Sequence, residues 1–439
     1  MSYQTGIINN LIENTIEIFF PDEPDTPPVT QENIVSESMS LRQTICDGEQ
    51  LRFGGCVASQ FSIKLMNTAA RQFDDTLTGK WIAVKITQRY ADPDVLVYPS
   101  DDLYPSDSLY PGRTTGEQVF WVFSGFIDSV PVDKNDRNIY NVTAYDALAK
   151  LHSEDATDDL FQRFKTHGYY LEQIFGMCTT DRGISATGFL AYLNETYTVN
   201  DVSRRVGAYN VKNDYWLNRK DRVTYGTLLR YVCELLGVFG VMVPDSGKGY
   251  FTFRTLNGSM EAYGFYEQLT AENYQSTGYT DFRFSVSGNA RNSKSVTSID
   301  GGLSDAASGA VDKTYDFSDN ILVLEEYTES SQGRTSTPFD YLINRTSIGT
   351  RLALNAASAS HSGQCAFSAY HPLEATLDGR LWVSVGAPIE ILVNRTTVDG
   401  DYVIVDGVIQ KETVRTYVLT RTLTGIQALT DNIEVKGVT

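Results

Sequence analysis

The sequence predicts a mainly β protein with α+β insertions. Short runs of β-branched and aromatic residues recur near period two between about residues 45 and 145, and again after residue 380. The composition agrees, because 26 Tyr and 21 Phe in 439 residues with 41% hydrophobic content are typical of an ordered, strand-rich protein. Helical spacing of apolar residues is concentrated in the middle of the chain. The length allows about three domains at roughly 150 residues each.

Residues 1–39 are predicted to form an acidic N-terminal arm. They contain seven Asp and Glu and no Lys or Arg, and the proline-rich centre, Phe20–Pro28, cannot be helical. We expect this arm to lie outside the folded domains and to become ordered only on a partner surface. Deleting residues 1–28 is then expected to leave the melting temperature nearly unchanged and to weaken assembly.

Residues 40–150 are predicted to form a first β-barrel domain. Strand-like alternation covers residues 57–65, 81–87, 119–127 and 139–143, as expected for a small barrel or sandwich. Between two of these strands lies a hexapeptide repeat, Tyr98–Gly112, whose Pro and Asp content favours successive exposed turns. Either the repeat packs on itself or it is a docking surface for a neighbouring protein.

Residues 151–274 are predicted to form a mixed α+β domain. Apolar residues are helically spaced from Tyr169 to Met177 and from Tyr225 to Leu236, after a shorter helical segment at residues 145–151. Thr224 is placed to cap the third helix, and a hairpin follows over residues 238–253.

Residues 275–317 together with 380–439 are predicted to form a second β-barrel domain. Residues 318–379 interrupt it as a small inserted α+β domain with a helix near residues 347–357. The expected strands of this part of the chain are 282–286, 321–324, 381–385, 388–393, 402–405, 408–409 and 416–424.

The charge and hydropathy exclude several classes of protein. Lys and Arg number 36 against 55 Asp and Glu, so the net charge of −19 repels nucleic-acid phosphates and anionic lipid headgroups. The longest apolar run, 235–243, is far shorter than the roughly 20 residues that span a bilayer. No basic residue precedes Arg42, so a secretory signal is not expected and the chain is expected to stay in the cytosol that makes it. The five Cys are expected to be buried free thiols.

The sequence carries no recognisable catalytic or metal motif. Its four His, at 152, 167, 361 and 371, are not spaced as metal ligands, and GxSxG, GxxxxGK[ST] and GxGxxG are all absent. Adjacent acidic pairs such as Asp158-Asp159 point in different directions and do not form the facing carboxylates of a glycosidase. We therefore predict no catalytic, cofactor-binding or metal-binding residues, no cofactor, and no enzyme activity.

Several segments, taken in order, resemble a known family. They are Leu51–Phe61, Phe123–Ser129, Tyr140–Leu148, Thr224–Gly237 and Gly379–Gly386. Their sequence and order are similar to phage tail baseplate hub proteins, the hub and tail-associated family of phages and prophages that infect Gram-positive bacteria. The resemblance extends over most of the chain from about residue 35.

The resemblance implies two tube-like β-barrel domains plus two smaller mixed domains in each chain, and a trimeric ring of six barrels. Such a homotrimer is a structural adaptor that joins the sixfold tail tube, or distal tail protein ring, to a threefold spike, fibre or tail-tip protein below. A tape-measure protein is a further possible partner. The ring forms a channel through which DNA passes without specific binding. The protein is then expected in the virion, in the tail baseplate, after assembly in the host bacterial cytoplasm.

Two other functions compete with the hub. One is a tail-associated cell-wall hydrolase, which the lack of a hydrolase motif disfavours; the chain also ends at Thr439 without the appended peptidase or lysozyme domain of many relatives. The other is a carbohydrate-binding receptor module, which the 26 Tyr and 4 Trp favour because aromatic faces stack on sugars. Against it, the aromatic residues mostly alternate within strands, where packing explains them.

Overall fold

The computed structural model describes most of the N-terminal half and the C-terminal strands. The described residues are 12–45, 55–91, 115–164, 169–186, 196–199, 202–205, 210–211, 222–236, 239–254, 267–270, 284–286, 373–378, 381, 384–386, 388–394 and 403–435. The Tyr98–Gly112 repeat, the predicted strand 321–324 and the predicted helix 347–357 lie outside them.

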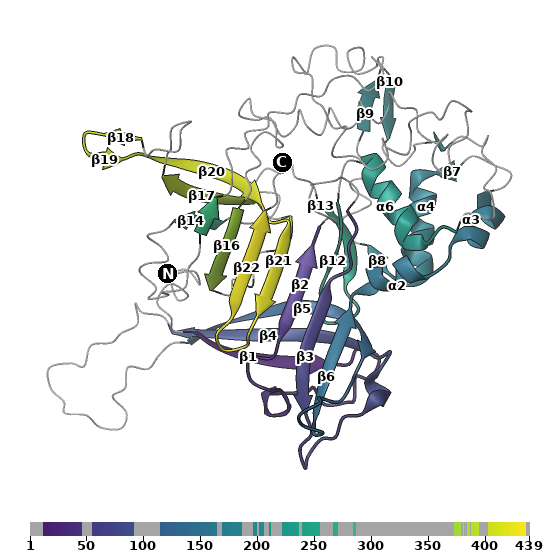
Figure 1. Ribbon diagram of the computed structural model, residues 1–439. Coiled ribbons are helices and arrows are strands. Elements are labelled where there is room, and N and C mark those ends of the chain that lie inside the picture. Colours follow the sequence, from purple (N-terminus) through teal and green to yellow (C-terminus); the bar gives the residue numbers. More distant parts are fainter. Residues whose placement is uncertain are drawn as a thin grey trace, which may run out of the picture.

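One curled sheet of ten strands dominates the described structure, in the order β1-β4-β5-β6-β3-β2-β21-β22-β16-β15 (Figure 1). All of its pairings are antiparallel. Its N-terminal strands are β1 (Ile12–Phe19), β2 (Ser40–Thr44), β3 (Gln60–Met66), β4 (Trp81–Ala91), β5 (Thr115–Ser129) and β6 (Ile139–Tyr145). Its later strands are β15 (Phe284–Val286), β16 (Leu373–Asp378), β21 (Thr420–Thr424) and β22 (Thr430–Val435). The prediction of a mainly β protein with α+β parts is confirmed.

The first six strands, called the barrel below, curl around a single hydrophobic core. Four of them, β3 to β6, follow the alternation predicted for residues 57–143. In β4, Ile82, Val84 and Ile86 point inward and are fully buried. Across the core the Phe61 and Phe123 rings stack with centroids 5.0 Å apart. At Gly125 a Cβ atom would lie 2.2 Å from the Tyr145 carbonyl oxygen, so the close approach of β5 to β6 requires glycine.

The prediction that residues 1–39 lie outside the barrel is wrong for the part that the structure describes. Strand β1 pairs with β4 through eight residues, from Ile12↔Tyr90 to Phe19↔Ala83. Ile16, Ile18 and Phe20 alternate with more exposed residues and are 1–5% exposed in the barrel core. The segment forms a strand despite its acidic composition, because its apolar side chains face the core and its acidic side chains lie on the other face of the strand.

The following segment closes part of the barrel. Val29 exchanges two backbone hydrogen bonds with Ile18 of β1, at 2.9 and 2.8 Å, and the Val35 amide then donates to the Lys64 carbonyl of β3 at 2.9 Å. Between them the chain forms a short 3-10 helix, η1 (Gln31–Asn33). Residues 20–28 form turns rather than helix, as predicted from their prolines. A second 3-10 helix, η2 (Asp75–Leu77), precedes β4.

A mixed α+β unit follows β6, as predicted (Figure 1). Its helices are α2 (Ala147–Ser153), α3 (Thr157–Phe164), α4 (Leu171–Cys178) and α6 (Tyr225–Leu236), with the 3-10 helix η4 (Thr180–Arg182). Strands β12 (Phe239–Val243) and β13 (Tyr250–Arg254) form the predicted hairpin and pair with β8 (Ser185–Ala186). Two short pairs accompany them, β7 (Tyr169–Tyr170) with β11 (Asn210–Val211) and β9 (Thr196–Val199) with β10 (Val202–Arg205). Thr224 caps α6, since its Oγ1 accepts from the Thr227 amide at 3.1 Å.

The described C-terminal strands belong to three sheets. Strands β15, β16, β21 and β22 extend the main sheet, whereas β14 (Glu267–Thr270), β17 (Pro388–Asn394) and β20 (Lys411–Tyr417) form a separate one. Strands β18 (Ile404–Val405) and β19 (Val408–Ile409) form a small hairpin. A strand at 381–385 is not observed at its described residues, where Leu381 and Val385 are buried in turns. Strand β16 lies within the predicted inserted domain 318–379, and the main sheet therefore reaches into it.

The two-barrel organisation and the trimeric ring stay predictions. Among the described residues, no helix has the length and apolar character needed to cross a membrane.

Candidate functional site: the seam between the barrel and the C-terminal hairpin

An N-terminal strand and a C-terminal strand of the described chain meet in one strand pair. Strand β2 pairs with β21 through five residues, from Ser40↔Thr424 to Thr44↔Thr420. Leu41 and Leu423 face each other in this pair and are both buried, while the Thr44 and Thr420 hydroxyls are 3.0 Å apart. The strand pair joins the barrel to the C-terminal hairpin, defined here as β21, β22 and the turn 425–429 between them.

The turn of the C-terminal hairpin enters the barrel core. Ile426 and Leu429 belong to the same buried cluster as Ile16 of β1. The Gly425 amide donates to the Met39 carbonyl at 3.0 Å. Gly425 has φ +87, and a Cβ there would lie 2.4 Å from the Ala428 carbonyl oxygen, so this tight turn depends on glycine. Figure 1 shows the hairpin reaching down from the later strands to β1 and β4.

Glu37 fixes the turn from the barrel side. Its two carboxylate oxygens accept separate backbone hydrogen bonds, from the Ile426 amide at 2.8 Å and the Gln427 amide at 3.1 Å. Glu37 has φ +54, in the left-handed region that a residue with a side chain rarely adopts. These contacts compensate for that unfavourable backbone conformation.

Replacing Glu37 with alanine is expected to lower the free energy of unfolding by about 1–3 kcal/mol, because two backbone amides lose their charged acceptor. Glu37→Gly is expected to cost less than Glu37→Ala, since glycine adopts positive φ without strain. Urea unfolding of the full chain measures both, with Glu32→Ala, at an exposed position, as a control expected within about 0.5 kcal/mol of wild type. Equal stability of Glu37→Ala and wild type would show that the Glu37 contacts do not secure the seam.

A buried amide network continues the seam across to β1. The Asn14 side chain donates to the Gln427 carbonyl at 3.1 Å, and the Gln427 side chain donates back to the Asn14 carbonyl. Gln88 of β4 donates to the Asn14 Oδ1 at 2.9 Å, and both of these residues are buried. The barrel opens between its two outer strands, β1 and β2. The turn therefore bonds to both margins of this opening, to β1 through Asn14 and to the segment before β2 through Glu37.

A buried ion pair spans the C-terminal hairpin itself. Arg421 Nε lies 2.9 Å from both carboxylate oxygens of Asp431, and Nη2 lies 2.8 Å from Oδ2. The side chains are 5% and 0% exposed. A bidentate pair at this depth fixes the relative position of the two strands.

The α+β unit is attached to the barrel at a second place. Asp146, at the start of α2, accepts from the Ser59 amide at 2.7 Å and the Leu148 amide at 3.0 Å. His152 of α2 bonds to the Cys56 carbonyl at 2.6 Å, and the Gly240 amide of β12 donates to the Gly55 carbonyl at 2.8 Å. Segment 55–59 is therefore held between the barrel and the α+β unit.

Complete burial raises the pKa of Asp146 to about 7, although its hydrogen bonds from Ser59 and Leu148 favour the charged form. A carboxyl group with a raised pKa in the folded state binds more protons there than in the unfolded chain. Its contribution to stability is therefore fully present below about pH 4 and is lost as the pH rises through about 7.

The Asp146→Asn variant lacks this titration. Between pH 5 and pH 8 we expect the stability difference to shift in favour of the variant by at least about 1 kcal/mol. Urea unfolding of both proteins at the two pH values measures the shift. The absence of a shift would mean that the backbone hydrogen bonds outweigh burial and that the pKa of Asp146 is not raised, because a carboxyl group with an ordinary or lowered pKa is already ionised at pH 5 in both the folded and the unfolded state.

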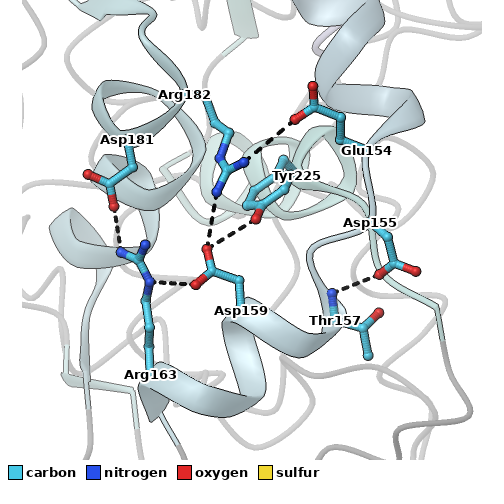
Figure 2. A network of polar contacts seen from close by, with 8 residues as sticks. All are labelled: Glu154, Asp155, Thr157, Asp159, Arg163, Asp181, Arg182 and Tyr225. Atoms are coloured by element: carbon cyan, nitrogen blue, oxygen red, sulfur yellow. Dashed lines mark hydrogen bonds and ion pairs between the residues drawn. The ribbon is translucent and has the colours of Figure 1, made fainter.

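The α+β unit also has an ion-pair network on its surface, centred on Asp159 of α3 (Figure 2). The Asp159 carboxylate accepts from Arg163 Nε at 2.7 Å and from the Tyr225 hydroxyl at 3.0 Å, and Arg182 Nη2 lies 3.5 Å away. Arg182 also lies over the Tyr225 ring, 4.3 Å from its centroid. Burial and the hydrogen bond to Asp159 raise the pKa of Tyr225 to about 12. The network links α3, η4 and α6, which indicates a bracing role.

Lysines cover aromatic rings on the outer face of the barrel. Lys150 Nζ lies 4.8 Å from the Trp81 ring centroid and 4.5 Å from that of Phe126. Lys248, from the β12–β13 turn, approaches Trp81 to 5.1 Å. Trp121 contacts the edge of Phe19. These contacts explain the two described Trp by packing and cation–π interaction, as the sequence pattern suggested.

Few groups among the described residues could bind a metal ion or act as a nucleophile. They contain no group of three or more His, Cys, Asp or Glu arranged to hold a metal ion. Cys56, Cys178 and Cys233 are free and buried, as predicted for the five Cys, and burial raises the pKa of the Cys178 thiol. Cys46 and Cys365, and His167, His361 and His371, lie outside the described residues. The absence of enzyme activity stays a prediction.

Comparison with known proteins gives distant structural matches only. No family model matches the sequence, and no curated protein does. The E. coli c3393 protein, a type VI secretion component described as similar to the T4 bacteriophage tail proteins gp27 and gp5, matches with a TM-score of 0.39 and 7% identity. That match covers 92% of this chain and 74% of the other.

Two PdpA-VgrG complex structures match at 10% identity. The lidless complex has a TM-score of 0.36 and the half-lidded Francisella complex has 0.33, each covering 97% of this chain. This chain spans 65% and 58% of the length of those two chains. TM-scores of this size do not establish a common fold, so the function is argued from the residues of this chain. The Gram-positive phage type stays a prediction.

Proposed function

We propose that this protein is a structural hub of a phage-type tail. Three copies form a ring that joins a sixfold tail tube, or distal tail ring, to a threefold spike, fibre or tail-tip protein. The ring encloses a channel for genome passage. This proposal rests on the resemblance of the segments between Leu51 and Gly386 to tail hub proteins and on the way in which the chain connects its strands.

The observation that supports the proposal most is the β2–β21 pair. A chain that supplies two neighbouring positions of a sixfold ring must hold two β units side by side in a fixed orientation. Here the C-terminal strands continue the sheet of the first barrel, and the turn 425–429 is bonded to both margins of the barrel opening. A flexible linker between independent domains would not fix such an arrangement.

The acidic character fits a channel for DNA. With a net charge of −19, the chain repels the phosphate backbone at long range, so a lumen lined by its acidic residues would let DNA slide without binding.

The mass of the purified protein in solution tests the proposal. Three chains of 48.9 kDa give 146.7 kDa, and light scattering at micromolar concentration and physiological salt is expected to report that mass. Adding the tail-tube or tip partner at the same concentration extends the test to assembly on a template. A monomer that stays monomeric with either partner would contradict the hub function.

A further inference from the structure

The C-terminal hairpin closes the two sides of the barrel opening differently. On one side, β21 forms a regular five-residue ladder with β2. On the other side the hairpin forms no ladder with β1, which is the terminal strand of the ten-stranded sheet. The hydrogen bonds between the turn and β1 each use a side chain, that of Asn14 in one bond and that of Gln427 in the other. The hairpin therefore covers the outer edge of β1 without pairing with it as a strand.

Ile16 has backbone polar groups on this outer edge. Ile18 exchanges its outward-facing N–H and C=O with Val29, and alternate residues of a strand direct these groups to the same edge, so those of Ile16 also face the opening. No described residue forms a hydrogen bond with them on this side. Ile16 is nevertheless only 1% exposed. Burying an unpaired peptide group costs free energy comparable to a lost hydrogen bond.

A second unsatisfied group lies in the amide network under the turn. Gln88 is 1% exposed and its Nε2 donates to Asn14, but no described residue donates to its Oε1. Most buried side-chain oxygens in folded proteins do accept a hydrogen bond. The closed seam therefore buries polar groups that water would satisfy.

The backbone of Glu37 is the third unfavourable feature of the seam. Apart from Asp406 in the β18–β19 turn, Glu37 is the one non-glycine residue of the described chain with a positive φ. Its carboxylate contacts with the two turn amides compensate for this conformation only while the turn is in place. All three unfavourable features thus lie where the hairpin meets the barrel, and departure of the hairpin relieves all three.

The hairpin and the barrel are each held together by their own contacts. Strands β21 and β22 pair through five residues, and the buried Arg421–Asp431 ion pair joins them. The barrel has a core of its own, in which the Phe61 and Phe123 rings stack. The seam between hairpin and barrel is therefore the boundary at which a partial opening costs least.

We propose that the C-terminal hairpin is a latch, which leaves the barrel opening as a unit while β3 to β6 stay folded. The closed state predominates, because Leu423, Ile426 and Leu429 of the hairpin are buried in the barrel core. In this state the latch keeps the outer edge of β1 from pairing with other chains. The open state exposes Ile16 and Gln88 to water. The latch rests on the contacts of the seam and not on the proposed hub function.

Hydrogen exchange of the full chain, measured by mass spectrometry, tests the latch. Peptides from residues 419–429 are expected to exchange at least about tenfold faster than peptides from residues 82–88 of β4. Their exchange is also expected to depend less on urea concentration, because only part of the chain opens. Equal exchange rates with equal urea dependence would show that hairpin and barrel open together, and would overturn the proposal.

A disulfide between β2 and β21 is expected to hold the latch closed. Ser40 and Thr424 face each other at a ladder position without a mutual hydrogen bond, since the adjacent Gly425 amide donates to the Met39 carbonyl. Oxidation of the variant Ser40→Cys with Thr424→Cys is expected to slow exchange in residues 419–429 at least about tenfold relative to the same variant reduced.

The variant Ser62→Cys with Thr143→Cys is the matched control. Ser62 pairs with Ser40 on one side and with Thr143 on the other, so this disulfide replaces the same residue types in the same row of the sheet but joins β3 to β6 within the barrel. Its oxidation is expected to change exchange in residues 419–429 by less than about twofold. Equal slowing by the two disulfides, or no slowing by the first, would overturn the latch.

The outcomes for the latch and for the hub are separate. Trimers in which residues 419–429 exchange no faster than β4 would contradict the latch alone. A chain that stays monomeric with its partners but has a fast-exchanging hairpin would contradict the hub alone.

Discussion

Deleting residues 1–28 is expected to prevent the N-terminal barrel from folding. The deletion removes strand β1 and with it Ile16, Ile18 and Phe20 from the core. Truncating one such buried side chain typically costs about 2–5 kcal/mol, and a whole domain is stable by only about 5–15 kcal/mol. We expect the shortened chain to lack a cooperative thermal transition by circular dichroism.

Single substitutions in β1 test whether the buried face of this strand contributes to the free energy of unfolding. Ile16→Ala is expected to lower the free energy of unfolding by about 2–5 kcal/mol, whereas Glu13→Ala, at an exposed position of the same strand, is expected to change it by less than about 0.5 kcal/mol. A deletion variant that melts at the wild-type temperature would contradict the placement of β1 and would restore the interpretation of this segment as an external arm.

Removing one member of the Arg421–Asp431 pair is expected to destabilise the protein by about 3–5 kcal/mol, because the remaining charge is buried without its partner. Asp431→Asn and Arg421→Met each test this by urea unfolding. The C-terminal hairpin fills the barrel opening, so the loss is expected to increase proteolysis within the N-terminal barrel as well.

The double variant Arg421→Met with Asp431→Leu is the informative control. Replacing both charges with apolar groups is expected to recover most of the stability, since no buried charge is left unpaired. If the single variants cost less than about 1 kcal/mol, the pair would be behaving as an exposed one and the buried seam would be placed incorrectly.

The local parts of the fold were predictable from the sequence. Strands β3 to β6 follow period-two alternation, and α6 follows helical spacing with Thr224 as its cap, because burial of one face imposes the same repeat on the residues. The prediction for the N-terminal segment was wrong, because burial of the alternating Ile16, Ile18 and Phe20 holds β1 in the sheet despite the acidic residues and prolines of this segment. The prolines do exclude helix in residues 20–28, but β1 ends before them.

The seam was not predictable, because its contacts join residues about 390 positions apart, as in the Glu37–Gln427 pair. Glu37 gives no local signal; only its positive φ and its two amide partners reveal its role. Arg421 and Asp431 do give a weak sequence signal for a buried ion pair, since each is a charged residue at an inward position of a strand-like sequence. The pairing of β2 with β21 also joins distant parts of the sequence, and the alternation within each strand does not determine its partner strand.

Electron microscopy of the purified, associated protein tests the hub most directly. The account predicts class averages of a ring with threefold symmetry, with a central channel and six β units around it, two from each chain. Rings with only one β unit per chain, or assemblies without threefold symmetry, would contradict it.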